Sequence, residues 1–259
     1  MTKRLPNIVD RIVVPLTLPL LITLLWEVVV RLGQIPPFIL PSPIRVLPTM
    51  VEVFPDLLPH LRITLLEFAI GFSLALLLAI FIALLMDALP LAKKMVYPLL
   101  VVSQTVPIIS VAPLFLIWFG YGILPKVLVV ILVCFFPIGI SLLEGLAAVD
   151  AELLKLLKAM GASRFQIYRL VKIPAALPAL LAGLKISASY SIMGAIIGEW
   201  LGAMQGIGYY MNLAQHAFSV DRVLVAVLVI TILSLAVFKI VCLLEKILMP
   251  WQTPEAWED

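Results

Sequence analysis

Uncharged polar side chains interrupt two long apolar runs of this chain, PLLVVSQTVPIISVAPLFLIWFGYG and the run that ends in IIGEW. Hydroxyl and amide groups inside such runs can line a passage for a polar solute, or they can hydrogen-bond to neighbouring helices. The spacing of Ser103, Pro107 and Ser110 places them on one helical face, which favours a passage there. In the second run the two interpretations stay open. The candidates for a passage are Ser103, Gln104, Pro107, Ser110, Ser187, Ser191 and Glu199.

The residues that usually carry catalysis or bind metals are scarce and scattered. The two histidines, His60 and His216, fall outside the apolar runs, and the sequence has no H-E-x-x-H pattern. Cys134 and Cys242 lie inside apolar runs, which is typical of small core residues. We therefore predict no catalytic residue, no metal ligand and no cofactor bound by this chain. An intramembrane enzyme is disfavoured.

The segments that carry these side chains are predicted membrane spans. Of the 259 residues, 63% are apolar and 13% are charged, whereas soluble domains have about 45–50% and 25%. The net charge of +3 does not favour nucleic-acid binding. The long, uninterrupted apolar runs predict an all-α, polytopic transmembrane bundle forming one domain over 1–259. The six expected spans cover about 12–30, 64–86, 96–119, 125–143, 174–198 and 223–245.

Lysines and arginines predict how these spans are oriented. With the N-terminus inside, twelve fall on the cytoplasmic side, including Lys3, Arg4 and Arg11, and five fall outside. The excess of positive charge on one side predicts that both termini are cytoplasmic. Lys185 lies within the fifth run. It marks either a functional site at mid-membrane depth or a side chain that reaches the inner surface, and we favour the second.

Prolines and small residues predict where spans break and pack. Seven of the twenty prolines lie in the outer stretch 31–63, which predicts a turn and a short surface helix rather than one long helix. Pro107 and Pro113 predict a broken third span. Small residues four apart in the second span favour close helix packing. They are Gly71, Ala75, Ala79 and Ala83.

The inner loop 144–173 is predicted to form a helical hairpin. Leu153, Leu156, Leu157 and Met160 give its first helix an apolar face, and Gly161 ends that helix. Ser163, with Gln166 three residues later, predicts a capping box that opens a second helix. Pro174 predicts a turn into the fifth span. The hairpin either lies on lipid headgroups or is a docking surface for a soluble partner.

Motifs along most of the chain resemble one family. The run from Gly161 to Pro178, G-A-S-R-x-x-x-x-x-x-V-x-I-P-A-A-L-P, resembles the cytoplasmic EAA loop of bacterial ABC importer permeases. LPSP at 40–43, the segment from Pro113 to Gly120 and GEW at 198–200 resemble the group for nitrate, sulfonates, taurine and thiamine-precursor pyrimidines. One departure is that Lys155-Leu156-Leu157 stands where this family has Glu-Ala-Ala.

The resemblance implies a type I importer permease in the bacterial inner membrane. It implies a homodimer, two cytoplasmic ABC ATPases that bind ATP-Mg, and an extracytoplasmic substrate-binding protein. GEWLGA with Tyr209-Tyr210 is most similar to the hydroxymethylpyrimidine (thiamine-precursor) branch; the alternatives are sulfonate, taurine or nitrate import, or a membrane scaffold. The residues that the resemblance assigns to coupling with the ATPase are Glu152, Lys155, Leu156, Leu157, Ala159, Gly161, Ala162, Ser163, Arg164 and Pro174.

Overall fold

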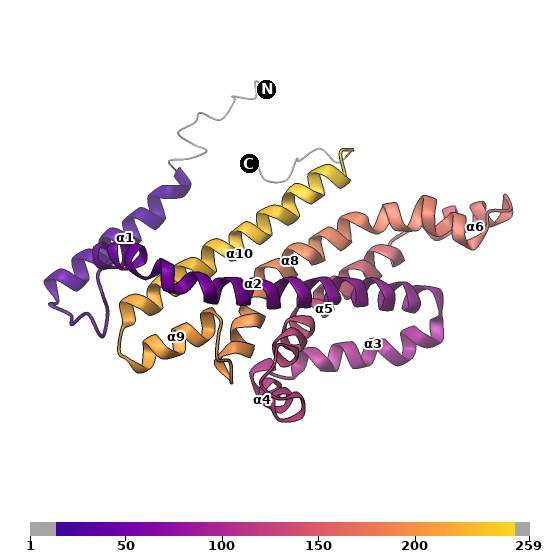
Figure 1. Ribbon diagram of the computed structural model, residues 1–259. Coiled ribbons are helices and arrows are strands. Elements are labelled where there is room, and N and C mark those ends of the chain that lie inside the picture. Colours follow the sequence, from indigo (N-terminus) through magenta and orange to yellow (C-terminus); the bar gives the residue numbers. More distant parts are fainter. Residues whose placement is uncertain (1–13, 252–259) are drawn as a thin grey trace, which may run out of the picture. The chain divides into compact units, whose positions relative to one another are not determined.

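The computed structural model describes residues 14–251, and over that range it contains helices and no strand (Figure 1). The all-α prediction is therefore confirmed for the described residues. Lys3, Arg4 and Arg11, on which the predicted orientation partly depends, lie outside them. The helices are α1 (Val14–Leu32), α2 (Pro43–Ala88), α3 (Pro90–Thr105), α4 (Ile108–Phe119), α5 (Leu124–Ala147), α6 (Ala151–Ala159), α7 (Arg164–Ile167), the π-helical turn η2 (Tyr168–Lys172), α8 (Ile173–Trp200), α9 (Ile207–His216) and α10 (Val220–Leu248).

Within the described residues, four helices are long and apolar enough to cross a membrane. They are α2, α5, α10 and the continuous helix Arg164–Trp200, which joins α7, η2 and α8. The bent pair α3 and α4 can form a fifth span. Helix α1 coincides with the first expected span, and its 19 residues approach the length that a bilayer requires. The number of six spans and the cytoplasmic termini stay predictions.

Helix α2 corrects one prediction from the sequence. Residues 43–88 form one helix of 46 residues, although a turn and a separate surface helix were expected in the proline-rich stretch. Pro48, Pro55 and Pro59 all lie on the exposed side of this helix. Val53 and Leu57, on the other side, are 2% and 0% exposed. Each proline removes one backbone hydrogen bond, and burial of the opposite face offsets that loss.

The described residues fold as two compact units. The first comprises residues 14–58 and 210–229, and the second comprises residues 59–209 and 230–251. In the first unit, Val46 and Val53 of α2 pack with Val225 of α10 in a small apolar core. At the edge of this core, Nε of Arg45 lies 3.6 Å from a carboxylate oxygen of Asp221.

In the second unit, α5 packs closely against both α2 and α8. Ala75, Ala79 and Ala83 of α2 are fully buried, and Cα of Ala79 lies 4.0 Å from the Cβ position of Gly139 in α5. On the other side of α5, a Cβ at Gly183 of α8 would lie 2.7 Å from the backbone oxygen of Pro137. The packing role predicted for the small residues of the second span is thus confirmed, since both helix pairs approach at small side chains.

Candidate functional site

The predicted hairpin of the inner loop is present as α6 and α7. The Asp150 carboxylate accepts a hydrogen bond of 2.8 Å from the Glu152 N–H and caps α6. Gly161 ends the helix with φ of +85°, an angle that glycine adopts without a steric cost. Ser163 and Gln166 form the expected capping box, with bonds of 3.3 and 2.7 Å. These local predictions are confirmed.

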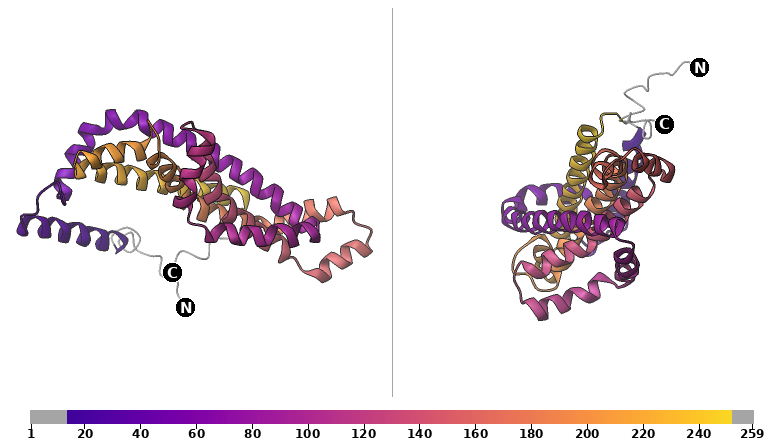
Figure 2. Two further views of the ribbon diagram at one scale, coloured as in Figure 1. Left: turned by 90° about the horizontal axis from the view of Figure 1, so that it is seen from below. Right: turned by 90° about the vertical axis from the view of Figure 1, so that its right-hand side faces the viewer.

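The hairpin presents apolar side chains that the second unit leaves uncovered. No residue of α6 is buried. Leu156, Met160 and Phe165 are 58%, 75% and 71% exposed, and we call them the hairpin face. Figures 1 and 2 both show α6 beyond the corner where α2 meets α3. A projecting apolar face needs either a protein partner or lipid to cover it.

The other coupling candidates lie around this face, and one prediction about them is wrong. Leu157 and Ala162 are half-buried. Pro174 does not mark a turn into the fifth span, because α7 continues through η2 into α8 as one helix. Pro174 is one of the first residues of α8 and has no backbone N–H to donate. It is therefore tolerated where the π turn passes into the α-helix. The exposed candidates are Glu152, Lys155, Leu156, Ala159, Gly161, Ser163, Arg164 and Pro174.

The third apolar run is broken at Pro107, as predicted, but not at Pro113, which lies inside α4. Helix α3 ends at Thr105, α4 begins at Ile108, and the two axes differ in direction by 102°. The prediction that Ser103, Pro107 and Ser110 share one helical face is wrong, because this bend separates them. Ser103, Gln104 and Ser110 are nevertheless all exposed and flank the bend. The Ser103 hydroxyl donates to the backbone oxygen of Leu100 at 2.7 Å.

The polar candidates of α8 face the interior of the second unit. Ser187 and Ser191 are 0% exposed. The Ser187 hydroxyl donates to the backbone oxygen of Cys134 in α5 at 2.9 Å, and that of Ser191 donates to Ala188 in its own helix at 2.9 Å. This geometry supports the packing interpretation of the second run, since both hydroxyls are satisfied within the α5–α8 contact or within α8.

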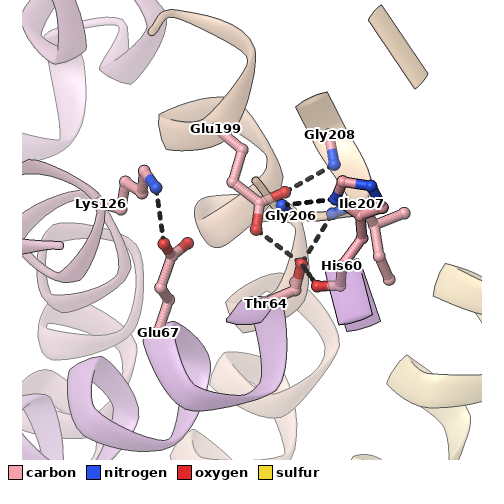
Figure 3. Close-up of polar contacts among 8 residues, drawn as sticks. All are labelled: His60, Thr64, Glu67, Lys126, Glu199, Gly206, Ile207 and Gly208. Carbon is pink, nitrogen blue, oxygen red and sulfur yellow. Dashed lines mark hydrogen bonds and ion pairs between the residues drawn. The ribbon is translucent and has the colours of Figure 1, made fainter. Parts of the chain in front are cut away.

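Glu199 belongs to a buried polar cluster that joins α2, α8 and the start of α9 (Figure 3). Its carboxylate accepts hydrogen bonds of 2.6 Å from the Thr64 hydroxyl and 2.6 Å from the Gly208 N–H. Thr64 in turn accepts from the Ile207 N–H at 2.9 Å, and Nδ1 of His60 accepts from the Gly206 N–H at 3.1 Å. Side chains of α2 and α8 thus satisfy the backbone donors that open α9.

Glycines leave the space that the Glu199 carboxylate occupies. At Gly206, where φ is +112°, a side chain would overlap the carboxyl of Glu199. At Gly208, a Cβ would lie 2.9 Å from the backbone oxygen of Ile196. Sequence reasoning missed this cluster and treated Glu199 only as a candidate for the passage. The glycines that follow GEW at short intervals were the only feature of the sequence that indicated a tight turn there.

Two ion pairs within the second unit were also not predicted. Nζ of Lys126 in α5 lies 2.8 Å from Oε1 of Glu67 in α2, and both side chains are almost completely buried. Nζ of Lys185 in α8 lies 2.5 Å from Oε2 of Glu245 in α10. The charge of Lys185 is thus balanced by a partner on another helix. That its side chain reaches the inner surface stays a prediction.

Comparison with known proteins connects this architecture to transport. Residues 75–252 match the family model described as "Binding-protein-dependent transport system inner membrane component". The "Formylaminopyrimidine transport permease protein ThiX" of Halalkalibacterium halodurans is 37% identical over 90% of this chain and 93% of its own length. The "Putative aliphatic sulfonates transport permease protein SsuC" of Bacillus subtilis is 30% identical over 92% of this chain and 87% of its own.

A solved structure supports the fold independently. The "Crystal structure of an amino acid ABC transporter with histidines" matches with a TM-score of 0.63 over 76% of this chain and 96% of that chain. Sequence identity in this match is 19%. The fold over that part of the chain is therefore shared with a chain of this ABC transporter structure.

Proposed function

Because this chain belongs to the family of binding-protein-dependent transport system inner membrane components, we propose that its hairpin couples a thiamine-precursor importer to ATP hydrolysis. The chain is the transmembrane permease of an ABC importer in the inner membrane, and ATP hydrolysis belongs to a separate subunit. The observation that carries the coupling role is the exposed hairpin face on a capped hairpin.

The hairpin fits an ATPase surface better than it fits a bilayer. An interfacial helix would place its apolar residues on one side and its cations around them. Leu156 and Met160 of α6 and Phe165 of α7 lie instead on both arms of a hairpin that projects from the unit (Figure 2). Such a shape can enter a groove on a soluble partner, and the exposed cations Lys155 and Arg164 can pair with carboxylates at its rim.

The assembly that we propose contains two copies of this chain, two cytoplasmic ATPases that bind ATP-Mg and one extracytoplasmic binding protein. Two permease chains supply the two hairpins that a pair of ATPases would grip. Closure of the ATPases would then displace both hairpins, and each continuous helix from α7 to α8 would carry that displacement into a span. We place the solute pathway at the exposed bend between α3 and α4, with Ser103, Gln104 and Ser110 along it.

For the solute we propose a thiamine-precursor pyrimidine. The name of the Halalkalibacterium halodurans relative supports this choice, as do the uncharged hydroxyl and amide groups at the bend, which suit a neutral heteroaromatic ring. The Bacillus subtilis relative favours an aliphatic sulfonate as the second candidate. A sulfonate is an anion and would bind more strongly to cations along the pathway than to hydroxyl groups.

The docking role is tested by placing charge on the hairpin face. In membranes that contain the permease and its ATPase, Leu156→Glu and Met160→Glu should abolish copurification of the ATPase, because each buries a carboxylate in the interface. Met204→Glu is the matched control, because Met204 is 80% exposed but lies between α8 and α9, away from the hairpin and outside the spans. Unchanged copurification of the ATPase with both hairpin variants would refute the docking role.

The solute is tested on the binding protein that delivers it. A thermal-shift screen of that protein should include a formylaminopyrimidine, the corresponding aminopyrimidine, taurine and a short alkanesulfonate. We expect stabilisation by a pyrimidine, since a ligand that binds only the folded state raises its melting temperature. Stabilisation by the alkanesulfonate or by taurine, without an effect of either pyrimidine, would overturn the pyrimidine proposal.

A further inference from the structure

A polar cluster ties the root of the hairpin to the end of α2, and we call Asp87, Tyr168 and Lys172 the Asp87 joint. Nζ of Lys172 lies 2.8 and 2.7 Å from the two carboxylate oxygens of Asp87. The Tyr168 hydroxyl donates to the same carboxylate, and the Lys172 ammonium lies 5.2 Å from the centre of the Tyr168 ring. The side chains of Asp87 and Lys172 are only 9% and 14% exposed. Charged hydrogen bonds in such a partly dry setting are strong.

The position of Asp87 indicates that the joint is held by these partners and not by α2 itself. Asp87 is the next-to-last residue of α2, where unpaired backbone carbonyls form the negative end of the helix dipole. A carboxylate is unfavourable there. The contacts with Lys172 and Tyr168 compensate for this unfavourable position. They hold the end of α2 against the π turn η2 that follows the hairpin.

The two partners of Asp87 lie four residues apart in a π turn. Tyr168 and Lys172 are the first and the last residue of η2. Compared with an α-helix, a π turn contains one more residue, which rotates the helix before it by about 100° relative to the helix after it. Because residues four apart lie on one face of a helix, both side chains reach Asp87. A π turn breaks the regular backbone pattern and is often found at functional positions.

The joint connects the hairpin to the bend through a short path. Helix α2 ends at Ala88, and Leu89 alone separates it from α3, which leads to the bend at Pro107. We propose that Asp87, Tyr168 and Lys172 are positioning residues for ATP-driven transport, which transmit displacement of the hairpin to α3 and hence to the bend. This inference rests on the proposed coupling function of the hairpin and adds a second route beside the direct one through α8.

The test uses the whole importer, with binding protein and ATPase, in proteoliposomes. Asp87→Asn removes the charge and keeps the shape of the side chain. We expect it to lower the amount of solute transported per ATP hydrolysed at least about fivefold, the range typical of a lost coupling. Basal ATP hydrolysis and copurification of the ATPase should not change. Glu144→Gln is the control, since Glu144 is an exposed carboxylate near the end of α5.

A charge exchange separates transmission from simple stability. The double variant Asp87→Lys/Lys172→Asp restores an ion pair with reversed polarity, and we expect it to recover most of the lost transport per ATP. Tyr168→Phe should give a smaller loss. Normal coupling in Asp87→Asn, or a charge exchange that restores the amount of protein in the membrane but not coupling, would overturn the inference. If the wild-type importer shows no hydrolysis stimulated by loaded binding protein, the proposed function itself fails.

Discussion

Replacing Lys126 with methionine should destabilise the permease more than most single substitutions in it. The ammonium of Lys126 lies 2.8 Å from Oε1 of Glu67, and the two side chains are 7% and 1% exposed. Lys126→Met leaves the Glu67 carboxylate buried without its cation. Removal of one partner from a buried ion pair costs about 3–5 kcal/mol of folding free energy.

The double variant, in which both charges are removed, tests whether the unpaired charge causes the loss. In Glu67→Leu/Lys126→Met both charges are gone and apolar side chains of similar size fill the space, so the loss should be about 1 kcal/mol or less. Glu67→Leu alone leaves the Lys126 ammonium buried without its anion and should also cost about 3–5 kcal/mol. Reversible unfolding of the purified permease in mixed detergent micelles, followed by far-ultraviolet circular dichroism, measures all three. Additive losses in the double variant, or a loss under about 1 kcal/mol for Lys126→Met, would contradict this account.

Three further predictions concern other parts of the second unit. Gly183→Ala should destabilise the permease by about 1–3 kcal/mol in the same unfolding assay, because its Cβ would meet the Pro137 backbone oxygen, whereas Gly122→Ala, with open space around it, should have little effect. Gly161→Pro should leave the permease in the membrane but lower transport at least about tenfold by deforming the hairpin, and normal transport would refute this. Gln104→Glu should lower the rate of uptake of a neutral pyrimidine, measured with radiolabelled solute, because it places a charge beside the pathway. Unaltered uptake would show that the pathway does not run along the bend.

Local patterns predicted local structure well. The capping box at Ser163 and Gln166, the helix end at Gly161 and the break at Pro107 depend on residues within a few positions of one another. Each is therefore visible in the sequence without knowledge of the tertiary fold. The packing of small residues such as Ala79 was also predictable, because spans in a membrane approach one another at small side chains.

The remaining errors arise from contacts between distant segments. The rule that proline breaks helices is local, and it missed that burial of Val53 and Leu57 supports α2 through its prolines. The bond between Thr64 and Glu199 joins residues that are 135 positions apart, so no local pattern indicates it. The pairing of Lys185 depends on which helix packs beside α8, which the sequence of α8 alone does not specify.

The central claim, that an ATPase grips the hairpin, is tested most directly by photo-crosslinking in native membranes. A photoreactive amino acid at position 160, where Met160 is 75% exposed, should give a crosslinked product with a nucleotide-binding subunit. The same group at position 118, where Trp118 is 64% exposed on α4, should give no such product. Crosslinks from position 160 to lipid alone, in cells that contain the complete importer, would contradict the account.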